Sequence, residues 1–376
     1  MRKVYLDNAA TTPMDPEVVS EMIPMMQNHF GNPSSTHAFG REVKSKLELS
    51  RRRIAKILNA EASEIIFTSG GTEADNMALK CAVHDLGVTR IITSKIEHHA
   101  VLHTAEELEA SNVKLEFVKL DDLGHVDMDH LEGMLESNSE KTIVSLMHAN
   151  NEIGTMIDLV ACCELVHKYG GYFHSDTVQT MGHYKFDVKE LKVDFLTCSA
   201  HKLHGPKGIG FLYAKEGLNL QPLIQGGSQE RNRRAGTENI YGIVGLAKAL
   251  ELADHEVEEH QTHVQALKSY MIECLEKELP GVEFNGDAKG KSLYTVLSVL
   301  LPESSKADIL LFSLDLQGIA CSGGSACSSG SNKGSHVLEG IGKETQRPVA
   351  RFSFSRFTSK DDIDYTVDKI KEIYEI

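Results

Sequence analysis

Short runs of β-branched residues alternate with segments of helical periodicity through the first half of this 376-residue chain. Such an alternation is typical of a largely parallel α/β sheet, in which helices connect successive strands. We therefore expect a seven-stranded, mostly parallel sheet, with functional residues just beyond the strand ends. The expected strands are 65–69, 90–94, 115–120, 142–147, 172–176, 194–199 and 209–213, and the expected helices are 73–86, 98–110, 127–136 and 157–169.

The second half of the chain predicts a separate, smaller unit. A long helical pattern covers 239–279 and ends before Pro280 and Gly281. Beyond it lie apolar runs, a Gly/Ser-rich loop at 321–335, a strand-like run and a terminal helix from Lys360, which together suggest an α/β unit. We expect a large domain at 14–256 and a small domain formed by 1–13 and 257–376.

Charge and composition exclude several classes of partner. The 39 Lys and Arg residues against 54 Asp and Glu residues give a net charge of −15, which repels phosphate backbones and anionic lipid headgroups. The longest nearly apolar run, 293–301, is far shorter than the roughly 20 residues of a membrane span. Seven scattered cysteines predict reduced thiols, and the N-terminus carries no export signal. We expect a cytoplasmic enzyme that binds neither nucleic acid nor membranes.

Several motif-like segments are interpreted as decoys. The segment GDAKGKS at 286–292 has one residue too few between its glycines for a phosphate-binding loop, and GPKGIG at 205–210 is expected to be a turn. His99 and His103 have a helical spacing that suits a metal ion, but no third ligand is evident. No metal site is predicted from the sequence.

Polar residues suited to catalysis follow several of the expected strands. After 65–69 come Gly70, Gly71 and Thr72 at the start of a helix. Unpaired N–H groups at a helix N-terminus bind anions, so we expect Gly71 and Thr72 to bind a phosphate, with a simple Thr N-cap as the alternative.

Two further strand ends carry residues that could hold a flat heterocycle. His98 follows the strand 90–94 and could stack on a ring, although a capping histidine is the alternative. Asp176 ends the strand 172–176, and Gln179 comes three residues later. An acid and an amide in these positions can bind opposite edges of a heterocycle.

Lys202 identifies the heterocycle. It follows the strand 194–199, close to Ser199 and His201, and precedes a Gly-Pro turn. Desolvation lowers the pKa of such an amine toward neutrality, which makes it a nucleophile that forms a Schiff base with a carbonyl cofactor. An anion-binding turn, an acid for a ring nitrogen and a buried lysine together predict pyridoxal 5′-phosphate. The loop 226–239 adds three arginines and Thr237, with a solvated basic loop as the alternative.

The whole chain resembles the cysteine desulfurases, in the class V aminotransferase group of pyridoxal-phosphate enzymes. The motifs that carry this resemblance are YLDNAATTP, GNPSSTH, FTSGGTEADN, EHHAV, MHANNEIGT, HSDTVQTMG, SAHKLHGPKGIGFLY, RAGTEN, SGGSACSSG and RFSFSRF. The resemblance implies the type I pyridoxal-phosphate fold, a homodimer and a sulfur acceptor such as an iron–sulfur scaffold protein.

The resemblance also implies a role for each candidate residue. Lys202 would bind the cofactor covalently, with His98 stacked on its ring. Asp176 would face the ring nitrogen and Gln179 the ring hydroxyl. The phosphate would be bound by Gly71, Thr72, Ser199 and His201 of one subunit and by Thr237 of the other. Asn151 and Arg351 would position the substrate, since the guanidinium fork suits a carboxylate.

Cys327 distinguishes sulfur chemistry from simple amino transfer. It lies in a Gly/Ser-rich segment, where a thiolate could attack the sulfur of bound L-cysteine, carry it as a persulfide and release alanine. Cys321 is interpreted as a bystander or a resolving thiol. Two enzyme alternatives are a selenocysteine lyase and a class V aminotransferase. A non-enzyme alternative is a sulfur or metal carrier that uses Cys321 and Cys327 on a degenerate scaffold.

Overall fold

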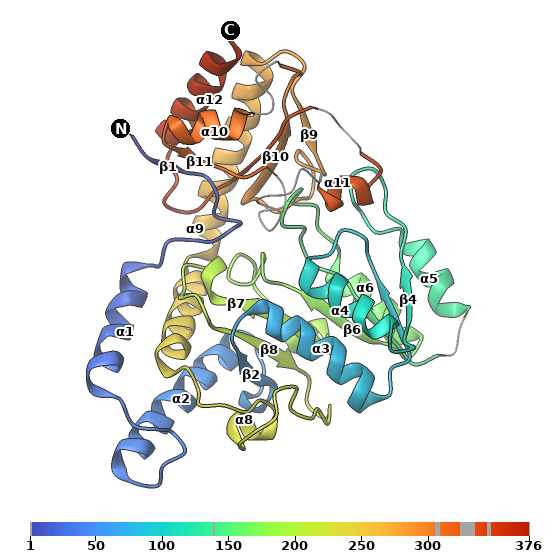
Figure 1. The fold of residues 1–376 in the computed structure, drawn as a ribbon, viewed down its shortest axis with the longest axis vertical. Helices are drawn as coiled ribbons and strands as arrows, with labels where there is room; N and C mark the ends of the chain where they lie inside the picture. Colours follow the sequence, from blue (N-terminus) through green and yellow to red (C-terminus); the bar gives the residue numbers. More distant parts are fainter. Residues whose placement is uncertain (1, 138–139, 305–308, 324–334, 344–346, 376) are drawn as a thin grey trace.

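The computed structural model describes residues 2–137, 140–304, 309–323, 335–343 and 347–375 (Figure 1). Its centre is a seven-stranded sheet with the order β2-β8-β7-β6-β5-β3-β4. All its neighbouring pairs are parallel except those that β8 makes with β2 and β7. The strands are β2 (Ile65–Thr68), β3 (Arg90–Thr93), β4 (Lys114–Phe117), β5 (Thr142–Ser145), β6 (Tyr172–Asp176), β7 (Phe195–Ser199) and β8 (Gly210–Ala214). All seven strands expected from the sequence are confirmed; β6 matches its run, and the others differ from theirs by one to three residues at an end.

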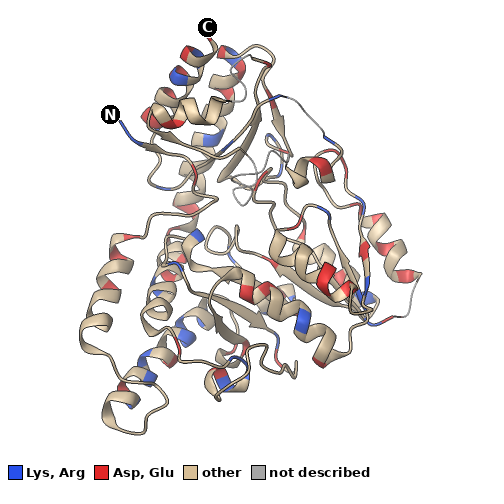
Figure 2. Ribbon diagram, in the orientation of Figure 1, with Lys and Arg blue, Asp and Glu red and all other residues tan. Residues whose placement is uncertain are grey.

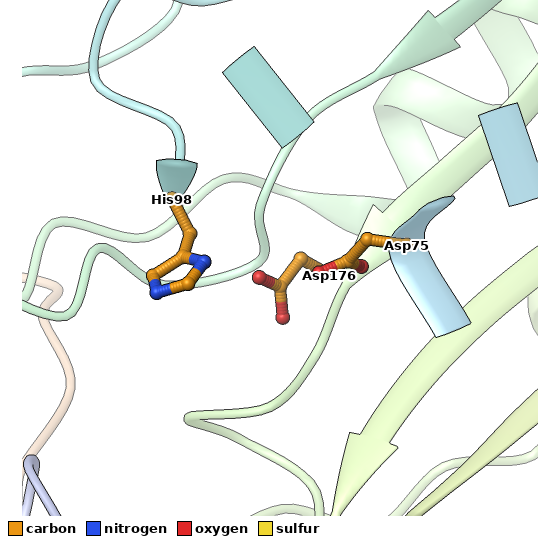
Figure 3. Close-up of side chains that lie close together, drawn as sticks. All are labelled: Asp75, His98 and Asp176. Carbon is orange, nitrogen blue, oxygen red and sulfur yellow. The ribbon is translucent and has the colours of Figure 1, made fainter. Parts of the chain in front are cut away.

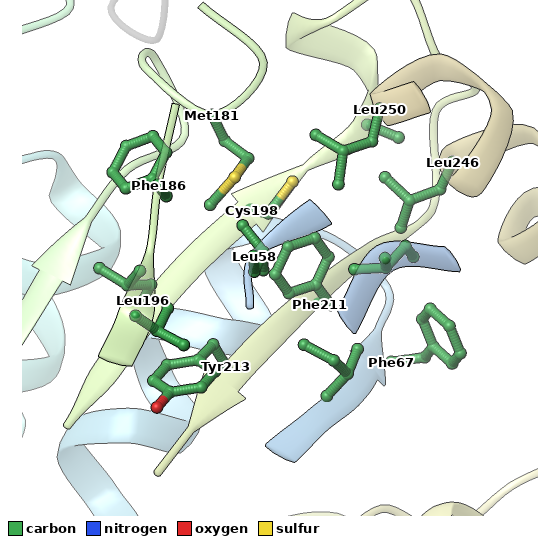
Figure 4. Close-up of a cluster of buried hydrophobic side chains, with 14 of the residues drawn as sticks. Leu58, Phe67, Met181, Phe186, Leu196, Cys198, Phe211, Tyr213, Leu246 and Leu250 are labelled. Carbon is green, nitrogen blue, oxygen red and sulfur yellow. The ribbon is translucent and has the colours of Figure 1, made fainter. Parts of the chain in front are cut away.

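Helices cover both faces of the sheet because successive strand residues point to opposite sides. Ile66 and Leu212 pack against α3 and α4 on one face. Their neighbours Phe67 and Phe211 pack on the other face, where Leu246 and Leu250 of the long helix also lie (Figure 4). The helices of this part are α1 (Pro16–Asn28), α2 (Ala38–Ile57), α3 (Gly71–Leu86), α4 (His99–Glu109), α5 (Met128–Glu136), α6 (Leu159–Lys168), α7 (Val188–Leu191) and α8 (Gln229–Asn232), with 3-10 turns η1 (Ala62–Glu64) and η2 (Ala200–Lys202).

The long helix α9 (Ile240–Glu278) connects two separate apolar cores. Its first part packs against the large sheet, and its second part packs in another core with the N-terminal residues Val4 and Leu6. A three-stranded sheet, β12-β10-β9, and the pair β1-β11 belong to this second core. The elements here are β1 (Val4–Tyr5), β9 (Glu283–Asn285), β10 (Val296–Leu300), α10 (Leu310–Leu316), β11 (Ile319–Ala320), α11 (His336–Gly340), β12 (Val349–Ser353) and α12 (Lys360–Tyr374).

Cys162 and Cys163 of α6 are buried in the core on one face of the large sheet, where the vicinal pair packs as apolar residues. The segment 286–292 lies between two strands of the small sheet, without the strand–loop–helix order of a phosphate-binding loop.

Charged residues are distributed over the outer helices. Figure 2 shows Asp and Glu on helices such as α3, α5 and α12, with Lys and Arg between them. Among the described residues, every helix falls short of the length or apolar content that crossing a membrane requires.

Candidate active site

Polar residues gather at one edge of the large sheet, where its parallel strands end. Asp176 is the last residue of β6 and Ser199 the last of β7. Gly70 follows β2 closely and His98 follows β3. Because β2 is parallel to β7 across the intervening antiparallel β8, all of these strands end at the same edge. The sheet topology therefore brings together residues that lie up to 129 positions apart in the chain.

A cavity of about 320 Å³ opens at this edge. Thr237 and Cys327 apart, every site residue predicted from the sequence lines it. These residues are Gly71, Thr72, His98, Asn151, Asp176, Gln179, Ser199, His201, Lys202 and Arg351.

The turn before α3 forms one wall of the cavity. A Cβ atom added to Gly71 would lie 2.7 Å from Cγ2 of Val178, so only a glycine lets this backbone approach so closely. The first N–H groups of a helix have no partner within the helix and carry partial positive charge. A phosphate group placed against Gly71 and Thr72 would receive these hydrogen bonds.

Asp75, His98 and Asp176 form an ionisable cluster inside the cavity (Figure 3). Each offers one nitrogen or oxygen atom that lies within 4.8 Å of the others, and Asp176 lies between the other two. Burial raises the pKa of Asp75 to about 7, and burial together with Asp75 raises that of Asp176 to about 6. These acids can accept a proton or bind a protonated ring nitrogen.

His98 has a double role in this geometry. Its Nδ1 accepts a hydrogen bond of 3.1 Å from the N–H of Ala100, so it is the N-cap of α4. This bond fixes the imidazole while the ring lines the cavity. Burial lowers the pKa of His98, although Asp176 acts in the opposite direction. The capping alternative and the ring-stacking interpretation are therefore compatible.

The N-terminal segment crosses the cavity at Lys202. Nζ of Lys202 donates to the carbonyl oxygens of Ala9 and Ala10, at 2.5 and 2.8 Å. Ala9 also accepts a 3.1 Å bond from Nε2 of Gln179. Nδ1 of His201 lies 3.1 Å from Oγ1 of Thr11. This segment thus orients three of the predicted site residues.

Arg351 is buried and also lines the cavity. Its Nη1 donates to the carbonyl of Asn151 at 2.9 Å, and its Nη2 pairs with Asp7 at 3.0 Å. Its Nε–H has no hydrogen-bond partner among the described residues. A guanidinium held on two sides in this way can bind a carboxylate in the cavity with little loss of side-chain freedom.

One predicted site residue lies elsewhere, and another falls outside the described residues. Thr237 is exposed and lines a separate hollow of about 180 Å³ with Ser69 and Arg234. Cys327 lies outside the described residues. Cys321 is described, and burial together with Asp7 raises the pKa of its thiol to about 12. A thiol whose pKa is raised in this way favours its protonated form at neutral pH, in which it is a poor nucleophile.

Sequence reasoning missed several residues of the site. Asp75 sits one turn into α3 among alanines, and the signal that could have found it is an acid on the apolar face of a helix that begins at the site. Asp7, which pairs with Arg351, and the carbonyls of Ala9 and Ala10 gave no comparable signal. They reach the cavity because the chain crosses it.

The cavity fits the pyridoxal phosphate that the sequence predicts. The glycine turn offers N–H groups to a phosphate, Lys202 is within the cavity, and the Asp75–Asp176 pair is available to a ring nitrogen. Oδ1 of Asp75 is buried without a hydrogen bond in the described residues, and Nε2 of His174 lies 3.5 Å from it.

Comparisons with known proteins find relatives that match nearly the whole chain. The model of a family described as aminotransferase class-V matches residues 4–366. A cysteine desulfurase IscS of Dictyoglomus turgidum is 44% identical over 379 residues, which cover 100% of this chain and 95% of that protein. A putative cysteine desulfurase IscS 1 of Bacillus subtilis is 45% identical over 359 residues, 94% of this chain and 93% of the relative. A solved structure titled NifS-like protein superposes with a TM-score of 0.91 at 36% identity, and both chains are covered fully.

The buried carboxylate pair predicts a pH dependence of stability. The pKa values of Asp75 and Asp176 are raised in the folded protein, to about 7 and about 6, whereas both titrate near ~3.9 in an unfolded chain. Between pH ~4 and ~7 the folded protein therefore binds more protons, so the contribution of this pair to the free energy of unfolding falls as the pH rises. Urea unfolding of the cofactor-free proteins measures this effect. The free energy of unfolding of Asp75→Asn minus that of wild type should increase from pH 5 to 7, by up to about 1 kcal/mol per pH unit.

The matched control is Asp368→Asn, which removes an exposed carboxylate of α12. Its free energy of unfolding relative to wild type should be independent of pH over the same range. A flat difference for Asp75→Asn as well would show that Asp75 does not hold a proton in the folded protein.

Proposed function

This chain belongs to the aminotransferase class-V family and is a cysteine desulfurase that uses pyridoxal 5′-phosphate, and from this premise we propose which residues perform the reaction. The observation that carries the proposal is the single cavity lined by Lys202, Asp176, His98 and Arg351 at the strand ends. The activity itself is tested by incubating the purified protein with L-cysteine and a reductant and measuring alanine and sulfide.

The cofactor is held by residues of four chain segments. Gly71, Thr72, Ser199 and His201 bind its phosphate, and Lys202 binds it covalently. His201 suits a hydrogen-bond role, because burial and the nearby Lys202 lower its pKa to about 4 and keep the ring neutral. Gln179 holds the ring hydroxyl, and His98 stacks on the ring. Asp176 binds the ring nitrogen and keeps it protonated, supported by the neighbouring Asp75.

When bound, the cofactor withdraws electrons from the amino acid joined to it, which makes its Cα–H acidic and weakens its Cβ–Sγ bond. Arg351 and Asn151 bind the substrate carboxylate. They thereby fix the orientation of the substrate and determine which bond of its Cα faces the catalytic side chains. Nζ of Lys202 takes and returns the Cα proton, and the imidazole of His98, which lines the same cavity, is a second proton carrier.

Cys327 receives the sulfur. Its thiolate forms a bond to the substrate sulfur, and the Cβ–Sγ bond breaks with its electron pair left on the carbon. A proton is added to that carbon, and alanine leaves. The sulfur remains on Cys327 as a persulfide. A thiol of an acceptor protein then bonds to the outer sulfur, the S–S bond to Cys327 breaks, and the Cys327 thiolate is restored; the acceptor we propose is an iron–sulfur scaffold. Both transfers require thiols, in keeping with a reducing cytoplasm and with the six unpaired cysteines of the described residues.

We propose a homodimer in which Thr237 completes the phosphate site of the partner. In one chain Thr237 is exposed and faces a hollow other than the cofactor cavity. The exposed apolar residues Val19, Ile23 and Met26 form a stripe along α1, and beyond it Phe30 stacks on Phe39 with ring centroids 5.4 Å apart. Exposed apolar residues in such number on neighbouring helices are typical of a protein interface.

The division into a large domain at 14–256 and a small domain at 1–13 and 257–376 is supported by the two apolar cores that α9 connects. In this arrangement Cys327 belongs to the small domain and Lys202 to the large one. The thiol and the cofactor thus come from different domains, which allows the sulfur to leave the cavity after its transfer.

Covalent attachment of the cofactor tests the role of Lys202. Borohydride reduction of the holoenzyme followed by peptide mass spectrometry should find the cofactor on the peptide that contains Lys202. Lys202→Ala should retain no label and lose sulfide production by at least about 100-fold, because the positioned amine is absent. Lys207→Ala, which removes an exposed lysine of the same loop, is the control and should be labelled like wild type. Label on another lysine would contradict the assignment.

The thiol assignment separates Cys327 from Cys321. Cys327→Ser should keep the cofactor but form no persulfide on incubation with L-cysteine, as measured by alkylation and mass spectrometry. Cys321→Ser should form persulfide at close to the wild-type rate, because burial keeps the Cys321 thiol protonated. Persulfide on Cys321, or normal turnover of Cys327→Ser, would show that the roles are reversed.

The dimer interface is tested at the α1 stripe. Ile23→Asp places a charge on a side chain that is 45% exposed in the single chain, so it should leave the chain folded but weaken association by about tenfold or more. Sedimentation analysis would measure the dissociation constant. Val160→Asp on α6 is equally exposed and should leave the dimer unchanged. If the two variants associate equally well, the interface lies elsewhere.

A further inference from the structure

The loop at residues 226–239, here called the Thr237 loop, is held at two points. One is at β2, and the other is at the phosphate-binding turn that follows this strand. The first anchor is Glu230, which is buried and forms two 2.7 Å hydrogen bonds with the guanidinium of Arg51. The same carboxylate accepts a 2.9 Å bond from the N–H of Phe67 in β2. The loop is therefore fixed to the strand that leads into the phosphate-binding turn.

The backbone at this anchor is strained. Glu230, Arg231 and Asn232 have φ values of 44°, 57° and 63°, which lie in the left-handed region that non-glycine residues rarely adopt. Three such residues in succession persist only where the surrounding contacts outweigh their conformational cost. Here the buried Glu230–Arg51 pair provides those contacts, so the shape of the loop is imposed by its anchor.

The second anchor joins the loop to the phosphate-binding turn itself. Nε of Arg234 donates to Glu73 at 2.8 Å, and its Nη2 donates to the other carboxylate oxygen at 3.2 Å. Glu73 also accepts a 2.8 Å bond from the N–H of Ser69. The Glu73 carboxylate thus bridges the two ends of the turn formed by Gly70, Gly71 and Thr72. It belongs to the residue after the turn and accepts a hydrogen bond from the residue before it.

Charge effects agree with a strong pair at this point. Burial acts to raise the pKa of Glu73, but the hydrogen bonds from Arg234 and Ser69 outweigh it and the pKa is lowered. The bidentate geometry also fixes the direction of the guanidinium plane. Three residues after Arg234 the chain reaches Thr237, with the left-handed Gly236 between.

We propose that Arg234 is a positioning residue for cofactor binding, whose ion pair with Glu73 holds two phosphate-binding elements in place at once. One is the turn at 70–72 of its own chain, and the other is Thr237, which is offered to the second subunit. This inference rests on the homodimer proposed above. One ion pair then links the two cofactor sites of the dimer, so a change at Arg234 acts on both.

The test compares two neighbouring arginines of the loop on cofactor-free protein. Arg234→Gln removes the ion pair with Glu73. Arg231→Gln is the matched control, because Arg231 is exposed and pairs with Glu48 on α2, away from the turn. The dissociation constants of pyridoxal 5′-phosphate and of pyridoxal, which has no phosphate, are measured for both variants and for wild type.

Arg234→Gln should raise the dissociation constant of pyridoxal phosphate by about tenfold or more and leave that of pyridoxal unchanged. Arg231→Gln should change neither. If Arg234→Gln weakens the binding of both ligands equally, Arg234 only supports the fold. If it weakens the binding of neither, the ion pair plays no part in cofactor binding. Either result overturns the inference. Glu73→Gln keeps an oxygen for the Ser69 N–H but loses the charge, and it should reproduce the selective loss.

A mixed dimer tests the link to the partner. One chain carries Lys202→Ala and Arg234→Gln, and the other is wild type, so covalently held cofactor reports only the wild-type site. That site should lose cofactor about tenfold faster than in a mixed dimer whose altered chain carries Lys202→Ala alone. Equal rates would overturn the action across the dimer. A wild-type protein that forms no dimer or binds no cofactor would refute the proposed function, and the inference with it.

Discussion

The common direction of the parallel strands is the constraint on which the site depends. The same edge of the sheet holds the ends of β2, β3, β5, β6 and β7. Residues that follow these strands therefore lie in or around the cavity. The antiparallel β8 does not break this rule, because it enters the sheet at that edge and leaves β2 parallel to β7. A set of residues scattered over the sequence is concentrated in this way at one edge of the sheet.

The N-terminal segment joins the two halves of the molecule at the cavity. Leu6 pairs with Ala320 and Asn8 with Ser353 in the second core, whereas Thr12 bonds to His201 beside Lys202. The same stretch supplies the carbonyls that hold the amine of Lys202 and the carboxylate that orients Arg351. A few residues thereby fix the distance between the group that holds the cofactor and the group that holds the substrate.

Much of this arrangement could be predicted, for two different reasons. The strands and the helix α9 were found from their periodicity because burial on a sheet face or along a helix imposes a regular pattern on the sequence. Lys202, Asp176 and the turn at Gly71 were found because their chemistry suits a phosphate-bearing heterocycle. Helices α1 and α2 were not expected from the sequence, and neither were the short strands β1 and β11, whose two-residue pairing is too brief to leave a pattern.

The sequence by itself determined the α/β class and pointed to the cofactor, because strand spacing is local and the chemistry of Lys202, Asp176 and the Gly71 turn belongs to single side chains and one turn; the roles of Asn151, Arg351 and Thr237 came only from the family resemblance. Only the tertiary structure decided which distant groups meet. Asp75 behind Asp176, Asp7 against Arg351 and Glu73 against Arg234 are pairs of ordinary acids and bases in the sequence. The influence of each pair on the site depends on its burial and on the few ångströms between its members. Neither quantity can be read from the sequence, because both arise when distant parts of the chain fold together.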